Sequence, residues 1–164
     1  MLGLKSIFIC DDIELQLSEN QGVTVESLKV SDHMNQRPVT FTSDMPVAEA
    51  VERLLHAKQM GGPVIDAQNK VIGFLSEQDC LSQMIESTYY QEQVAHVKDI
   101  MRSEVLAIKP YTSVIELAQQ MTTAKPKVYP VVDDDGYLLG TINRSALLHA
   151  LDLHLHDGYK SPTS

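Results

Sequence analysis

Short apolar runs alternate with polar turns along the chain, most clearly between residues 62 and 79. Two runs rich in β-branched residues, 62–66 and 71–75, flank the polar stretch 67–70. The apolar positions that follow Ser76 recur at helical spacing. This pattern predicts a strand, a hairpin turn, a second strand and then a helix.

The same pattern returns 67 residues later without an insertion or deletion. Pro63 recurs as Pro130, and Gly73 recurs as Gly140. A fixed period over several matched positions indicates an internal duplication.

Each copy is expected to fold as strand, helix, strand, strand, helix, with the leading strands at 39–42 and 105–108. A unit of this size buries little apolar surface alone, so we expect the two copies to pack face to face into one α/β module. The chain then divides into an N-terminal extension, a first repeat, a connection, a second repeat and a tail, at 1–29, 30–86, 87–96, 97–156 and 157–164.

The first helix of each copy is preceded by residues that commonly begin helices. Ser43 and Asp44 come just before Pro46, which predicts a side-chain cap with a proline in the first turn. Ser113 is followed three residues later by Glu116, which is the spacing of a capping box.

Composition narrows the classes of partner. The 164 residues are 43% hydrophobic and carry a formal net charge of -9, which repels a polyanion, so nucleic acid is not an expected partner. No apolar run has the length of a signal peptide core or a membrane span. We therefore expect a cytoplasmic protein without a membrane partner, in which Cys10 and Cys80 are free thiols.

The ordered set of motifs resembles a pair of CBS domains, the Bateman module. It contains Asp-x-Met at Asp32 and Asp99, apolar-Pro-Val-apolar-Asp in both copies, and Gly-apolar-apolar-Ser-x-x-Asp ending at Asp79. The likeness extends from about Val30 to Leu151. It implies an α/β fold of two repeats related by pseudo-two-fold symmetry.

The resemblance also implies a regulatory role without catalysis. CBS pairs commonly bind AMP, ADP, ATP or S-adenosylmethionine between their repeats and often form homodimers. No catalytic residue and no required cofactor are expected, and the regulated partner protein is not identifiable from the chain. The alternative is a structural dimerisation module that binds no nucleotide.

The resemblance assigns roles to two residues at the start of a helix. Ser76 matches the position that contacts phosphate, and Asp79 matches the carboxylate that accepts hydrogen bonds from ribose hydroxyls. Helix N-termini favour phosphate because their free N–H groups carry partial positive charge. The same spacing also fits a capping box that only satisfies the helix end, and both roles are compatible.

Further residues match the family site less directly. Thr40, Gly62 and Pro63 align with the wall beside the adenine, although the glycine also suits a helix stop before a strand. In the second copy Asn143 and Ala146 replace the serine and the aspartate, so a second site is in doubt. Arg144 is expected either to reach phosphates held by the first repeat or to lie solvated at the surface.

A metal site is not expected. The run Asp133 to Gly136 does not continue as a calcium-binding loop and is better explained as a hairpin turn. The three histidines near the C-terminus do not share one helix face; they are His149, His154 and His156.

Overall fold

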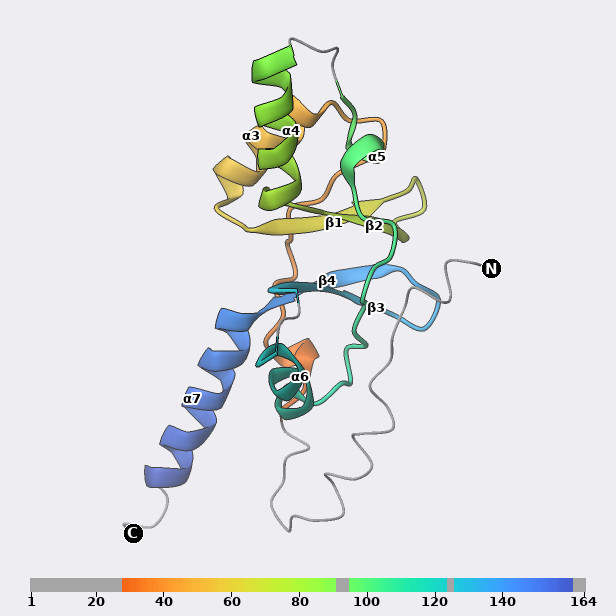
Figure 1. Ribbon diagram of the computed structural model, residues 1–164. Coiled ribbons are helices and arrows are strands. Elements are labelled where there is room, and N and C mark those ends of the chain that lie inside the picture. Colours follow the sequence, from red (N-terminus) through yellow and green to blue (C-terminus); the bar gives the residue numbers. More distant parts are fainter. Residues whose placement is uncertain (1–27, 91–94, 124–125, 161–164) are drawn as a thin grey trace.

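The computed structural model describes residues 28–90, 95–123 and 126–160. Most of the expected N-terminal extension, the middle of the expected connection and the last residues of the expected tail lie outside the described residues. The described part contains both copies of the duplicated pattern (Figure 1).

The first repeat has the predicted hairpin followed by a helix. Helix α3, Val47–Ala57, leads into strands β1, Gly61–Ile65, and β2, Val71–Ser76, and then into helix α4, Glu77–Tyr90. The two strands are antiparallel, and Gly62 pairs with Leu75. Helix α4 extends into the expected connection, as its residue pattern indicated.

The second repeat has the same order of elements. Helix α6, Val114–Met121, is followed by strands β3, Val128–Val132, and β4, Leu138–Asn143, and by helix α7, Arg144–Lys160. The hairpin β3–β4 is again antiparallel. Helix α7 continues beyond residue 156, where the tail was expected to begin.

The leading strands predicted at 39–42 and 105–108 are much shorter than expected. Each is reduced to one parallel bridge, between Phe41 and Val64 in the first repeat and between Ile108 and Val131 in the second. The prediction of a full strand was therefore wrong, and each sheet consists of the two strands of one hairpin.

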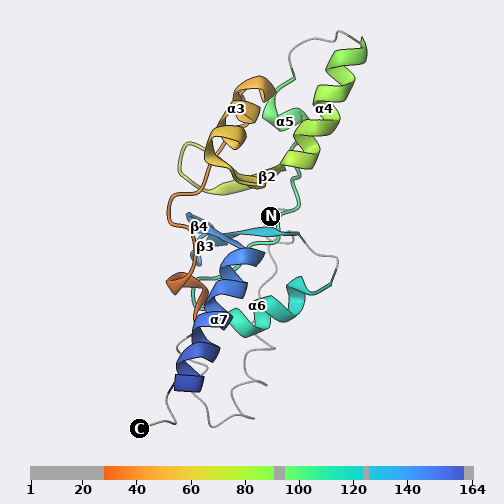
Figure 2. The ribbon, with the colours of Figure 1, turned by 90° about the vertical axis from the view of Figure 1, so that its left-hand side faces the viewer.

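The two hairpins lie face to face between the helices of the two repeats (Figures 1 and 2). Their turns are joined by backbone hydrogen bonds from Val71 to the Gly136 carbonyl, at 3.2 Å, and from Leu138 to the Asn69 carbonyl, at 2.9 Å. Because β2 and β4 both start at these joined turns, helices α4 and α7 both begin at the opposite end of the sheets.

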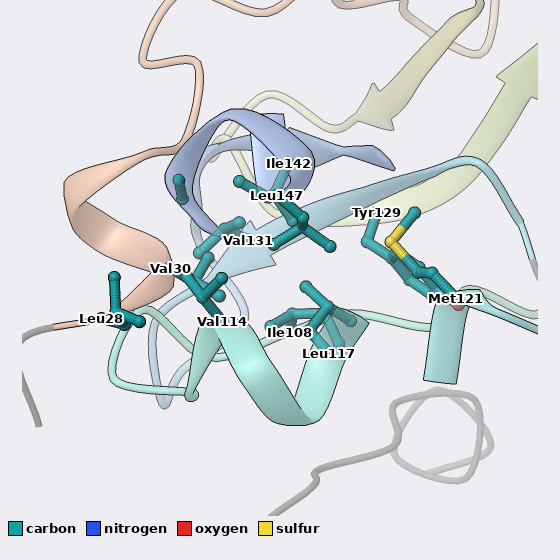
Figure 3. Packing of buried hydrophobic residues seen from close by; sticks show 11 residues of the cluster. Leu28, Val30, Ile108, Val114, Leu117, Met121, Tyr129, Val131, Ile142 and Leu147 are labelled. Atoms are coloured by element: carbon teal, nitrogen blue, oxygen red, sulfur yellow. The ribbon is translucent and has the colours of Figure 1, made fainter. Parts of the chain in front are cut away.

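The first segment of each sequence repeat packs into the core of the other repeat. The short helix α5, Val97–Ile100, places Val97 in the apolar cluster of the first repeat, with Phe41 and Leu75. The short 3₁₀ helix η2, Val30–Asp32, places Val30 in the cluster of the second repeat (Figure 3). The two cores are thus built by exchange of these segments, which supports the pseudo-two-fold relation.

This exchange also explains how helices α3 and α6 begin. The Val47 N–H donates to the Ala95 carbonyl, and the Val114 N–H donates to the Leu28 carbonyl, both at 2.9 Å. The residues before the two helices, Pro46 and Ser113, form no side-chain capping hydrogen bond. The predicted side-chain caps, with Ser43 and Asp44 and with Ser113 and Glu116, were wrong. The backbone carbonyls of Ala95 and Leu28, each just before the leading segment of the other repeat, take that place.

Two matched glycines allow the exchanged segments to lie directly on the sheets. A Cβ atom at Gly73 would lie 2.6 Å from Met101 Sδ, and one at Gly140 would lie 2.4 Å from the Asn35 carbonyl oxygen. The distance at Gly140 is too short for any other residue without movement of the backbone. At Gly73 the Met101 side chain would have to move, and the Arg102 carbonyl oxygen is also close, at 3.0 Å. The recurrence of glycine at these positions therefore has a packing cause.

The hairpin turn at Asp133 has the role expected from its sequence. The Asp133 carboxylate accepts hydrogen bonds from the backbone N–H groups of Asp135 and Tyr137, both at 2.9 Å. Within the described ranges, no three His, Cys, Asp or Glu side chains gather as a metal site. None of the described helices is long and apolar enough to cross a membrane.

Candidate functional site

The start of helix α4 is organised by Ser76 and Asp79. The Ser76 hydroxyl donates to Asp79 Oδ2 at 2.7 Å, and the Ser76 backbone N–H donates to the same oxygen at 3.1 Å. The Asp79 N–H donates back to Ser76 Oγ at 3.1 Å. These bonds form the reciprocal cap that the spacing allowed. Ser76 and Asp79 therefore cap the N-terminus of helix α4.

The second oxygen of the Asp79 carboxylate faces an arginine from the other repeat. Arg102 Nε lies 3.6 Å from Asp79 Oδ1. The Asp79 side chain is 16% exposed and that of Arg102 is 62% exposed, so the carboxylate is sheltered while the guanidinium reaches solvent. Both oxygens of Asp79 thus have partners.

Arg102 was not predicted as a site residue. It directly follows Met101, the last residue of the second Asp-x-Met motif. Phe74 and Arg102 bond to each other through both backbone groups, which fixes this segment beside the end of β2. Only a knowledge that the leading segments are exchanged between repeats could have identified it.

Three predicted residues form a wall next to the helix start. The Phe41 N–H donates to the Pro63 carbonyl at 3.1 Å, which holds the segment containing Thr40 along β1. Gly61 pairs with Ser76 across the hairpin, so Gly62 and Pro63 lie at the same end of the sheet as the cap. The structure therefore places Thr40, Gly62 and Pro63 along the strand of the hairpin that pairs with the one leading into Ser76 and Asp79.

The close packing of this wall depends on Gly62. A Cβ atom at Gly62 would lie 2.2 Å from the Val39 carbonyl oxygen. The Thr40 carbonyl accepts a hydrogen bond from Arg53 Nη1 at 3.3 Å, and Arg53 also pairs with Glu49. The wall is thus held from β1 on one side and from α3 on the other.

Cys80 follows Asp79 and points into the core of the first repeat. Burial, and to a smaller extent the neighbouring charges of Asp79 and Glu77, together raise the pKa of its thiol from 9.0 to about 11. A thiol that stays protonated at neutral pH is a poor nucleophile. Cys80 is therefore a poor candidate for a nucleophile at this helix start.

The second repeat lacks several of these features. Asn143 Oδ1 accepts from the Ala146 N–H at 2.7 Å, so the helix is capped as the sequence indicated, but Ala146 offers no carboxylate. Tyr129 occupies the position that matches Gly62 and is buried beside Met121 (Figure 3). The two helix starts are therefore chemically different.

Arg144 is the first residue of α7, and its side chain is exposed. Its backbone N–H donates to the Lys127 carbonyl at 3.1 Å. Within residues 28–90, 95–123 and 126–160, no hydrogen bond or ion pair joins Arg144 to Ser76 or Asp79. Arg144 thus begins α7 at the end of the sheets where α4 also begins, without a bond to the Ser76–Asp79 cap.

Comparison with known proteins agrees with this arrangement. The family model for the CBS domain matches residues 30–86 and again 97–153. CBSX2 from Arabidopsis thaliana, a CBS-pair protein, superposes with a TM-score of 0.68 at 27% identity over 79% of this chain and 97% of its own. A second structure, CBSX2 in complex with AMP, gives a TM-score of 0.67 at 28% identity, covering 79% and 98%.

Similar sequences occur both alone and within larger enzymes. An uncharacterized protein of Methanocaldococcus jannaschii, MJ1426, is 23% identical over 77% of this chain and 92% of its own length. Inosine-5'-monophosphate dehydrogenase of Aquifex aeolicus is 30% identical over 76% of this chain, which spans only 25% of that enzyme. With both repeats matched by the family model, the chain belongs to the CBS-domain family as a tandem CBS pair.

Proposed function

We propose that this chain is a non-enzymatic regulatory module that binds an adenosine-containing nucleotide at the start of α4. The observation that carries the proposal is the sheltered Asp79 carboxylate, held beside Ser76 and the wall at Gly62. A carboxylate can accept hydrogen bonds from the two hydroxyls of a ribose. The AMP complex of CBSX2, a relative with the same fold, supports this choice of ligand class.

Binding would redistribute the hydrogen bonds of the cap. The Ser76 hydroxyl has one proton, which it now donates to Asp79 Oδ2. In the proposed complex it donates that proton to a phosphate oxygen, and the ribose hydroxyls replace it as donors to Asp79. The Ser76 and Asp79 backbone bonds remain, so the helix end stays capped while the ligand is held.

The other predicted residues complete the proposed site. The adenine ring packs against Thr40, Gly62 and Pro63, where the absence of a side chain at Gly62 lets backbone groups approach the base. Arg144 supplies positive charge to the phosphates from the second repeat. The exposed side chain of Arg144 is free to move for this purpose.

The exchanged segments suggest how such a ligand would act as a signal. The site combines residues of the first repeat with a segment that begins the second, so a bound nucleotide contacts both. A ligand shifts a conformational equilibrium only through different affinities for the two states. We propose that an intracellular partner protein responds to that shift, and that nucleic acid is not the partner because the net charge is -9.

We also propose that the module is a homodimer formed through α4 and α7. Helix α4 exposes several large apolar side chains, and α7 exposes others, one of them at a matched place. Leu81 is 62% exposed and the matching Leu148 is 69% exposed. Apolar faces of this kind commonly mark contact surfaces between proteins. The exposed side chains proposed to form the dimer contact are Leu81, Met84, Ile85, Leu148 and Leu155.

A thermal-shift panel tests the ligand proposal. AMP, ADP, ATP and S-adenosylmethionine are each added to wild type, to Asp79→Ala and to Asp99→Ala. A ligand that binds only the folded state raises the melting temperature. We expect at least one compound to stabilise wild type and Asp99→Ala but not Asp79→Ala.

Asp99→Ala is the matched control. Asp99 Oδ2 accepts the His96 N–H at 2.9 Å, so this variant also loses a cap at a helix start while Ser76 and Asp79 stay intact. Each variant should lose about 1 kcal/mol of stability from the lost cap alone. If none of the compounds stabilises wild type, a dimerisation module without a nucleotide is the better description.

A further inference from the structure

Arg102 is positioned to act on the proposed ligand, although its role does not follow from the sequence motif. Its backbone is fixed to Phe74 by two hydrogen bonds of 2.9 Å, two residues before Ser76. Its Nε lies 3.6 Å from Asp79 Oδ1, and the side chain is 62% exposed. The base of the side chain is therefore anchored at the site, while its charged end is able to move.

The helix start has a charge problem for any phosphate-bearing ligand. Glu77 and Asp79 both lie in the first turn of α4, and the whole chain has a net charge of -9. The negative charges of these two residues also raise the pKa of the Cys80 thiol, after the larger effect of burial. Like charges disfavour a phosphate here unless a cation compensates them.

The ion pair with Asp79 blocks one of the two oxygens that a ribose needs. Asp79 Oδ2 is occupied by the cap, and Oδ1 faces Arg102. A nucleoside must displace the guanidinium from Oδ1 to use both oxygens. The pair has a largely exposed arginine and no direct hydrogen bond, so this displacement costs little.

We propose that Arg102 exchanges partners when a nucleotide binds, leaving the Asp79 carboxylate to the ribose and moving onto the phosphate. This inference rests on the proposed function. A guanidinium forms two parallel hydrogen bonds with a phosphate, which are stronger than a solvent-exposed ion pair with a carboxylate. Arg102 thus makes the site selective for adenosine compounds that carry a phosphate over adenosine itself.

Calorimetric titration with adenosine and with AMP tests this exchange. The proteins are wild type, Arg102→Ala, Arg102→Lys and Lys98→Ala. Lys98 lies four residues before Arg102, is exposed and pairs with Asp44, so its variant removes the same charge elsewhere on the segment. A hydrogen bond to a charged group corresponds to roughly a tenfold change in affinity.

We expect wild type and Lys98→Ala to bind AMP about tenfold more tightly than adenosine. In Arg102→Ala this ratio should fall towards one, while adenosine binds as tightly as before or more tightly because Oδ1 is free. Arg102→Lys should keep part of the preference, since it retains the charge but lacks the planar fork.

Three results would overturn the inference. One is an AMP preference in Arg102→Ala that equals that of wild type. Another is an equal loss of adenosine and AMP affinity in that variant, because Arg102 would then only position Asp79. If wild type binds neither compound, the inference is wrong; the proposed function is wrong as well only if ADP, ATP and S-adenosylmethionine also leave the melting temperature unchanged.

Discussion

Phe74 in the first repeat and Arg102 at the start of the second bond to each other through both backbone groups, at 2.9 Å in each direction. Asn35 and Thr141 form the same pair in the other half, at 2.7 and 3.0 Å. These two bridges attach the leading segment of each repeat to the hairpin of the other. The stability of either core therefore depends on residues from both sequence repeats.

Truncation of Val97 tests this dependence. Val97 is fully buried in the core of the first repeat although it belongs to the second copy in the sequence. Val97→Ala should lower the free energy of unfolding by about 2 kcal/mol, from lost burial and an incompletely filled cavity. Denaturant unfolding followed by circular dichroism measures the change.

The matched variant and the control lie on equivalent elements. Val30→Ala in the core of the second repeat should have an effect of similar size, because Val30 is also fully buried. Ile72→Ala should cost much less, since Ile72 is 36% exposed on β2. A loss in Val97→Ala no larger than that of Ile72→Ala would contradict the exchange of segments.

The sequence predicted the hairpins correctly because their causes are local. Two apolar runs flank a turn in which Asp66 or Asp133 accepts backbone N–H groups, and the duplication repeats the signal. The caps of α3 and α6 could not be predicted in the same way. The donors of α3 and α6 are satisfied by Ala95 and Leu28, far away in the sequence. Local patterns contain no information about such partners.

In the candidate site, too, the residues with local signals were predicted and those that depend on distant contacts were not. Ser76 and Asp79 were identified because a family motif places them three residues apart, and the wall with Gly62 follows from the hairpin register. Arg102 was missed because its contact with Asp79 depends on how the two repeats pack. Arg144 was assigned by its charge, and charge alone does not determine the position of a flexible side chain.

The buried thiol of Cys80 predicts a loss of stability at alkaline pH. In the unfolded chain the thiol titrates near its ordinary pKa of 9.0, whereas in the folded protein its pKa is about 11. Between these values the unfolded state releases the proton and the folded state keeps it, so stability falls as pH rises. The full effect is about 3 kcal/mol.

Comparison with Cys80→Ala separates this titration from that of other groups. Lysines and tyrosines titrate in the same range but are common to both proteins. The difference in unfolding free energy between wild type and Cys80→Ala should therefore shrink from about pH 9 to about pH 11. Parallel stability curves over this window would show that Cys80 does not titrate as described.

If the proposed dimer forms, a charge introduced into its apolar face should reduce the mass of the particle in solution from that of a dimer to that of a monomer. Leu81→Asp places a carboxylate on α4 where 62% of the leucine is exposed in the single chain. Burying that charge without a partner is costly, so the variant should be monomeric. Light scattering after size-exclusion chromatography measures the mass directly.

Leu139→Asp is the control for this experiment. Leu139 is an exposed leucine on β4, outside the α4 and α7 face, and its variant should keep the mass of wild type. A wild-type protein that elutes as a monomer at all accessible concentrations would remove the dimer proposal.

The differences between the two helix starts predict one nucleotide per chain. Ala146 provides no acceptor for a ribose where the first repeat has Asp79. Tyr129, which is 1% exposed, takes the place of Gly62 and is packed into the core. The second repeat therefore lacks both the carboxylate and the small residue on which the proposed site depends. Calorimetric titration should give a stoichiometry of one in wild type.

Two variants distinguish one site from two. Asp79→Ala should bind no detectable nucleotide, because the second repeat provides no site. With two equivalent sites in wild type, the variant would still bind half as much nucleotide. Asn143→Ala should lose about 1 kcal/mol of stability through the lost cap of α7 and keep its affinity and stoichiometry. Ala146→Asp restores the carboxylate alone and should leave the stoichiometry at one, since the buried Tyr129 still replaces the glycine of the wall. Two bound nucleotides in wild type would mean that the second repeat binds through groups other than those of the first.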